Sequence, residues 1–154
     1  MDYIIQLVTA FLGSLGFSLL FRVSKDKLLR ASFGGLISWG IYLIMGIWIK
    51  EEPLLYLIAS SAITIYAEIL ARKTKTPTTI YIVSAAIPLM PGGSLYDTMR
   101  AVVQQNMSGF FSNAKHTLLL AGAIALGIIS TMSIIQAIYH MYDEIQLKYK
   151  KRKK

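Results

Sequence analysis

A short run near the middle of the chain contains most of the residues suited to binding a ligand. Residues 87–94 read IPLMPGGS, and no charged residue occurs from Thr76 to Tyr96. Proline lacks an amide N–H and clashes with the preceding helical turn, and paired glycines weaken a helix. We therefore predict a transmembrane helix that breaks at Pro88, Pro91, Gly92 and Gly93. The alternative is a proline kink that only bends the helix.

A helix break of this kind has a specific chemistry. Backbone N–H groups at a helix N-terminus carry partial positive charge and bind anions such as carboxylates. Non-helical backbone at membrane depth is tolerated only where protein buries it or where it lines a water-filled cavity. Transporters bind their substrates at such breaks.

A polar stripe on the preceding predicted helix belongs to the same candidate site. Tyr56, Ser60, Thr64 and Glu68 recur every four residues, so they lie on one side of a helix. We expect the stripe to line a path to the break. The predicted substrate-binding residues are Pro88, Pro91, Gly92, Gly93, Ser94, Tyr96, Ser60 and Thr64.

Two carboxylates are candidates for carrying a coupling proton. An ionisable residue inside a span is a functional hypothesis by default. Glu68 either faces a cavity or forms an ion pair with Arg72, which follows four residues later. Asp97 either exchanges a proton or caps a helix for which Ser94 is the predicted N-cap.

The composition places these residues in an all-α membrane protein. Of the 154 residues 55% are hydrophobic and 16% are charged, and the mean hydropathy is +0.53. Such a chain has too little polar sequence for a separate soluble domain. It has no cysteine and two isolated histidines, so we predict neither disulfides nor a metal site. No nucleophile–base pair or nucleotide-binding glycine loop is present, so we expect neither an enzyme nor a cofactor.

We predict one transmembrane domain, residues 1–154, with five spans. The first three are residues 3–21, 31–49 and 54–71, the fourth is the broken segment 77–90, and the last is 117–139. From residue 77 to 89 a helix measures about 20 Å, whereas a hydrocarbon core measures about 30 Å. We expect the unwound segment, bilayer thinning or burial in a larger assembly to complete this crossing.

Two further features complete the predicted secondary structure. Apolar residues at three- and four-residue spacing predict a short amphipathic helix after the break, which ends at Ser108 and Gly109. Glycine, alanine and serine gather on one face of the first, second and last spans. Such faces allow close helix packing.

The positive charges predict the orientation in the membrane. With five crossings, 13 of the 16 Lys and Arg residues fall on one side. Positive charge favours the cytoplasmic side, so we expect the N-terminus outside and the C-terminus inside a bacterial inner membrane. Residues 143–154 then form a basic cytoplasmic tail beside anionic lipid. Because the net charge of +8 resides in short connections, it does not indicate nucleic-acid binding.

The run TKTPTTIYIVSAAIPLMPGGSLYDTM, after three spans and before one long span, resembles the threonine/serine exporter family. It is most similar to the small subunit, which corresponds to the C-terminal membrane half of the fused exporters. The family motif falls here on Pro77, Pro88, Pro91, Gly92, Gly93 and Tyr96.

The resemblance implies export of small hydrophilic carboxylates, either threonine and serine or a dicarboxylate such as succinate. It also implies coupling to the proton gradient and a larger, separately encoded membrane subunit as partner. Whether this chain also assembles with copies of itself stays open. The competing hypothesis is an accessory subunit that does not transport but stabilises or localises its partner. A passive channel is less favoured, because no ring-forming charged motif is visible.

Overall fold

The computed structural model describes residues 2–152, with side chains described for residues 3–142. Its elements in chain order are α1 (Asp2–Leu20), α2 (Lys25–Met45), α3 (Glu52–Thr74), α4 (Thr79–Ala86), the 3-10 turn η1 (Ile87–Leu89), α5 (Gly92–Val103) and α6 (Met107–Arg152). No strand occurs in the described chain. Four helices are long and apolar enough to span a membrane, or five if α4–η1 and α5 form one bent span. The predicted all-α membrane fold is confirmed.

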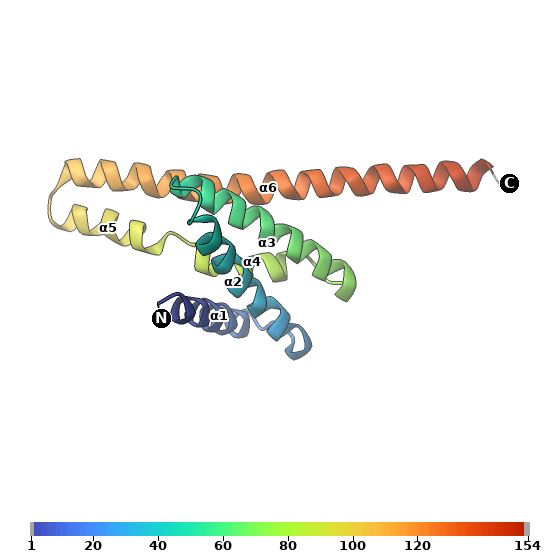
Figure 1. The fold of residues 1–154 in the computed structure, drawn as a ribbon, viewed down its shortest axis with the longest axis horizontal. Coiled ribbons are helices and arrows are strands. Elements are labelled where there is room, and N and C mark those ends of the chain that lie inside the picture. The colour runs from blue at the N-terminus through green and yellow to red at the C-terminus, as the bar shows by residue number, and fades with distance from the viewer. Residues whose placement is uncertain (1, 153–154) are drawn as a thin grey trace.

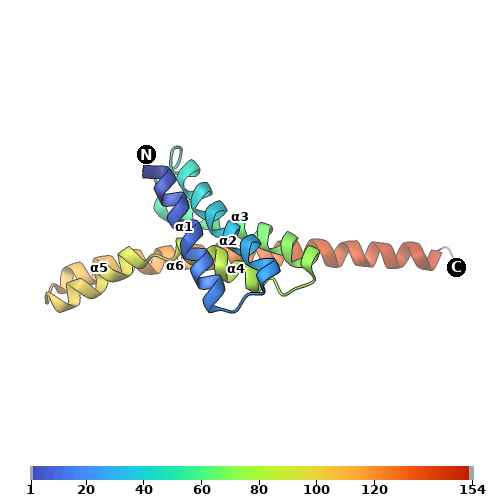
Figure 2. The same cartoon turned by 90° about the horizontal axis from the view of Figure 1, so that it is seen from below.

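The first four helices form a bundle beside the middle of α6, and α6 extends beyond the bundle in both directions (Figures 1 and 2). α5 runs back along the first turns of α6 and forms a hairpin with it. We call the end of the bundle with this hairpin and the α2–α3 connection (residues 46–51) the break end. The opposite end has the α1–α2 and α3–α4 turns (residues 21–24 and 75–78), and we call it the turn end.

The short helix α4 lies inside the bundle, in contact with α1, α2 and α3. Tyr81 and Ala85 are completely buried, and the Ser18 hydroxyl of α1 donates to the Ser84 hydroxyl at 2.8 Å. Against α2 the packing is tight, because a Cβ added to Gly34 would lie 2.6 Å from the Ala85 Cβ. Small residues thus allow α4 to sit in the core.

The close packing predicted from small residues is found at particular positions on each helix. A Cβ added to Gly127 of α6 would overlap the Ser60 hydroxyl and lie 2.7 Å from the Leu57 carbonyl oxygen, so α3 and α6 touch there. In α1, by contrast, Gly13 and Gly16 face open space. The serines of α1, not its glycines, face the bundle.

The break between α4 and α5 is shorter than predicted. η1 begins at Ile87 with Pro88 in its first turn, Met90 is extended, and Pro91 already caps α5. The two axes meet at a bend of 57°. Gly92 and Gly93 keep negative φ values, so they begin a regular helix instead of prolonging the break.

Ser94 is therefore not the N-cap of α5, and the predicted capping arrangement with Asp97 was wrong. Ser94 lies inside the first turn, and its hydroxyl is 2.7 Å from the Thr117 hydroxyl of α6. The path along α4, η1 and α5 measures roughly 36 Å at the usual rise per residue. This bent path is long enough to cross a hydrocarbon core of about 30 Å without a long unwound segment.

The amphipathic helix also ends earlier than predicted. α5 stops at Val103, and a turn with Gln105 at φ 55° leads into α6. The Asn106 side chain accepts a hydrogen bond of 3.0 Å from the Gly109 N–H, which is the contact of a helix N-cap. Ser108 and Gly109 consequently lie in the first turn of α6. Residues 153–154 of the predicted tail, and the side chains of residues 143–152, lie outside the described part.

Candidate functional site

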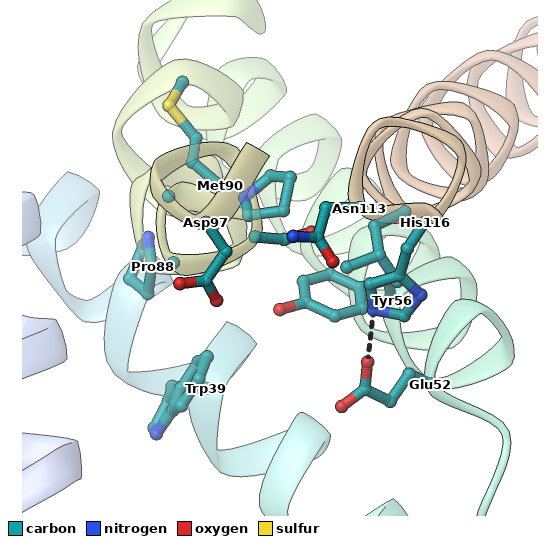
Figure 3. Close-up of a pocket in the computed structure, with 13 residues that line it drawn as sticks. Trp39, Glu52, Tyr56, Pro88, Met90, Asp97, Asn113 and His116 are labelled. Atoms are coloured by element: carbon teal, nitrogen blue, oxygen red, sulfur yellow. Dashed lines mark hydrogen bonds and ion pairs between the residues drawn. The ribbon is translucent and has the colours of Figure 1, made fainter. Parts of the chain in front are cut away.

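A pocket of about 450 Å³ opens at the break end, where α5 begins. Four helices and the break contribute to its walls (Figure 3). Its lining residues are Trp39, Glu52, Tyr56, Pro88, Met90, Pro91, Gly92, Gly93, Ser94, Asp97, Asn113, His116 and Leu120. The helix break and the pocket thus coincide.

The N-terminus of α5 supplies hydrogen-bond donors to this pocket. The Gly92 N–H bonds to the Met90 carbonyl at 2.7 Å, and the Leu95 N–H makes the first i→i−4 helical bond of α5, to the Pro91 carbonyl at 3.0 Å. Among the described residues no backbone acceptor is found for the N–H groups of Gly93 and Ser94. A helix leaves its first N–H groups unpaired, and a ligand anion satisfies them.

The glycines keep this end of the helix open. A Cβ built on Gly92 or on Gly93 meets no atom within 4 Å. Gly93 lies four residues before Asp97 and therefore shares its face of α5. An approaching ligand can reach the backbone there, whereas a large side chain would fill the space.

Aromatic and acidic side chains form the other walls. Figure 3 shows the Asp97 carboxylate and the Tyr56 hydroxyl pointing into the space above Trp39. Trp39 is held in place because its indole N–H donates to the Gln6 side chain at 3.1 Å and its ring stacks on Tyr42 at 4.8 Å. Donors at one end and a carboxylate beside them suit a ligand with both an anionic and a cationic group.

A hydrogen bond between a carboxylate and an imidazole joins α3 and α6 at the rim of the pocket. Glu52 Oε2 lies 3.0 Å from His116 Nε2, and both side chains are about half exposed, at 50% and 46%. An exposed pair of this kind adds little stability. Asp97, in contrast, has no hydrogen-bond or ion-pair partner among the side chains that the structure describes.

A second cavity of about 240 Å³ adjoins the pocket. Trp39 and Pro88 line both cavities, and Gln6 and Thr9 of α1 line the second one. The indole and the proline ring therefore contact both cavities at the break end.

The structure brings together only part of the predicted site. Six of the ten predicted residues line the pocket: Pro88, Pro91, Gly92, Gly93, Ser94 and Asp97. Tyr96 does not, because its side chain is 66% exposed on another face of α5. Ser60 and Thr64 are completely buried, and their hydroxyls donate to carbonyls of their own helix, at 3.0 Å and 2.7 Å.

Glu68 lies at the turn end, away from this pocket. It forms the ion pair with Arg72 that its spacing predicted as one alternative, at 2.8 Å. The Thr78 hydroxyl donates to its other oxygen at 2.7 Å. A separate, mainly apolar cavity of about 250 Å³ between α3 and α6 also includes Glu68.

Several pocket residues were not assigned to the site from the sequence. Trp39, Glu52, Asn113 and His116 come from three helices that are far apart in the chain. The acidic residues before Pro53 and the histidine before the last span are evident in the sequence. Polar residues of this kind are also common at a membrane interface, so they did not indicate a binding site. Spacing along the chain contains no signal that they meet.

The described side chains contain no cluster of metal-ligand residues. Within residues 3–142 no group of three or more His, Asp or Glu residues is arranged to hold a metal ion. The pocket contains two carboxylates, one imidazole and backbone donors, which suit hydrogen bonding and proton exchange.

The comparisons with known proteins identify one family. The family model described as "Threonine/Serine exporter, ThrE" matches residues 6–134. This range contains every residue of the pocket. No curated protein and no solved structure matches the chain.

Proposed function

This chain belongs to the threonine/serine exporter family, and we propose that it is one membrane subunit of a secondary exporter of small hydrophilic carboxylates. Family membership gives a transport role of the threonine/serine exporter type. The class of substrate, the coupling to protons and the partner subunit are parts of the proposal. The observation that supports it most is the pocket at the N-terminus of α5.

In this proposal the substrate carboxylate binds at the start of α5. The N–H groups of Gly93 and Ser94 donate to it, and the helix dipole adds attraction. The α-ammonium of threonine or serine then lies near Asp97 and above the Trp39 ring, since cations are attracted to aromatic faces. A dicarboxylate would place its second carboxylate against the same acidic wall, so the pocket favours amino acids.

Proton coupling is assigned to Asp97 before Glu68. Both carboxylates were candidates on the sequence alone. Asp97 lies in the pocket, where its charge would change the affinity for the substrate. Glu68 is engaged by Arg72 and Thr78 at the other end of the bundle. A proton on Asp97 would weaken its attraction for an ammonium group and promote release.

The proposed location rests on the charge pattern, and the proposed partner rests on the resemblance to the small subunit of the split exporters. We place the chain in a bacterial inner membrane with the break end outside and the C-terminus in the cytoplasm. Many large apolar side chains of α1 are exposed, among them Ile4, Ile5 and Leu12. They are suited to contact lipid or the larger membrane subunit that we propose as partner.

The test is efflux of preloaded labelled threonine, serine and succinate from cells. The chain is expressed alone and together with a candidate large subunit. Export of threonine or serine only with both chains is the expected result, and export by this chain alone would make it a complete transporter. Absence of export with the large subunit present, at normal membrane levels of both chains, would favour the accessory role.

A further inference from the structure

Four side chains at the turn end connect three helices through one buried carboxylate. Glu68 of α3 is only 8% exposed. One of its oxygens accepts from Arg72 Nε at 2.9 Å and lies 2.8 Å from Arg72 Nη2, and the other accepts from Thr78 at the start of α4. The Arg72 guanidinium in turn lies 3.4 Å above the centre of the Tyr139 ring of α6. We call Glu68, Arg72, Thr78 and Tyr139 the clasp.

Other contacts strengthen the junction between α3 and α4 at this end. The Tyr81 hydroxyl of α4 lies 2.9 Å from the Thr74 hydroxyl at the end of α3. Tyr81 is completely buried and packs with Ala67 and Ala71 of α3. These contacts join the end of α3 to α4 at the turn end. The cavity beside them, lined by Glu68 and Tyr139 among others, is mainly apolar and measures about 250 Å³, against about 450 Å³ for the pocket at the break end.

The contacts of α4 differ on its two sides. Toward α2 they are tight and apolar, with Gly34 directly against Ala85, and such packing separates only at high cost. Toward α3 near the turn end, side-chain hydrogen bonds accompany the packing of Tyr81 on Ala67 and Ala71. The Arg72 side chain is already 45% exposed, so water can replace its contacts when they break. The polar contacts of the clasp are thus the contacts of this end that water can replace.

We propose that the clasp is the gate that closes the turn end while the pocket at the break end is open. Opening requires Glu68 to release Thr78, which frees α4 from α3 and gives the core access from the turn side. This inference rests on the proposed transport function, since a transporter exposes its site to one side at a time. Glu68 acts in it as a positioning residue and does not touch the substrate.

The gate can be tested by thiol labelling, because the chain contains no cysteine. One reporter is Ser84→Cys, a buried position of α4 that is 1% exposed. The other is Gly93→Cys, in the pocket. A membrane-impermeant maleimide is applied to right-side-out and inside-out vesicles, each containing one reporter, and the labelling rates are measured without any substrate.

Glu68→Gln is expected to raise labelling of the Ser84 reporter from the turn side by about fivefold, which is the effect of a modest shift in a two-state equilibrium. Labelling of the Gly93 reporter should fall in the same background. Thr78→Val should act in the same direction although it leaves the Glu68–Arg72 ion pair intact. If the Glu68→Gln variant does not fold, the Thr78→Val variant still tests the gate.

The matched control is Lys73→Gln, which removes a neighbouring exposed charge outside the clasp and should leave both rates unchanged. If neither reporter responds to Thr78→Val, the clasp is not a gate. If both reporters become more reactive together, the clasp only stabilises the bundle, and the proposal is overturned. Labelling needs no substrate, so its outcome is independent of the export assay. A failed export assay would therefore count against the proposed function but not against the gate.

Discussion

A bulky side chain at Gly93 should abolish export by occupying the pocket. Gly93 begins α5 and shares a face with Asp97, and a Cβ there meets no atom within 4 Å. A tryptophan at this position would extend into the pocket without displacing backbone. The change Gly93→Trp therefore tests where the substrate binds, with little effect on the fold.

The size of the effect follows from the position of the added ring. A tryptophan side chain has more non-hydrogen atoms than threonine itself, and it would lie beside the N–H groups of Gly93 and Ser94, where we propose that the substrate carboxylate binds. It would therefore compete with the substrate for the same part of the 450 Å³ pocket. Export should fall by about tenfold or more, a loss of about 1.4 kcal/mol or more in binding free energy.

The assay is threonine efflux at matched membrane levels of each variant. Gly13→Trp is the control, because Gly13 also faces open space but lies on the exposed side of α1. Gly93→Ala should retain export, since one added carbon leaves room for the substrate. Normal export by Gly93→Trp would show that the substrate does not bind in this pocket. Equal losses in both tryptophan variants would show that bulk, not position, causes the defect.

Three further predictions concern the pocket and the packing. Asp97→Asn should lower export by about tenfold or more and remove its dependence on an imposed pH gradient, as measured in vesicles, because a neutral amide exchanges no proton; export that still follows the gradient would contradict this. His116→Gln should change the free energy of unfolding by less than about 0.5 kcal/mol, because its pair with Glu52 is half exposed; denaturation in detergent will show whether the pair matters more. Gly127→Val should cost about 1–3 kcal/mol because α3 touches α6 there, whereas Gly122→Val, in open space, should cost far less in the same measurement.

The helical spans and the break could be predicted because each rests on local chemistry. Uncharged runs of about 20 residues indicate helices that cross a membrane. A proline at position 88 and another at 91 interrupt a helix wherever the rest of the chain lies. The exact length of the break could not be predicted, because glycine adopts both helical and non-helical conformations. Gly92 and Gly93 are helical here.

The helix ends were less predictable for a related reason. Ser108 and Gly109 resemble the C-terminal end of a helix, so they were expected to end α5. Asn106 instead caps the N-terminus of α6, which places the connection between the two helices earlier in the chain. A signal for a helix end and a signal for a helix start thus occur within four residues, and the sequence does not show which one the fold uses. Preferences for caps differ by only about 1 kcal/mol, so tertiary contacts decide between neighbouring positions.

The walls of the pocket depend on tertiary contacts that spacing does not contain. The four-residue repeat correctly placed Tyr56, Ser60, Thr64 and Glu68 on one side of α3. That side points to the pocket only at its first member, because the Gly127 contact presses α6 against Ser60. A one-dimensional pattern gives the face of a helix but not the neighbour that covers it.

Hydrogen-bond satisfaction separates the structural polar groups from those suited to a ligand. A polar group in an apolar setting is costly unless it is paired. Thr64 and Glu68 have partners within the protein, so the fold accounts for their presence. The Gly93 N–H and the Asp97 carboxylate lack such partners among the described residues, and both lie in one pocket. Polar groups that the fold leaves unpaired in a shared cavity are the ones that a substrate can satisfy.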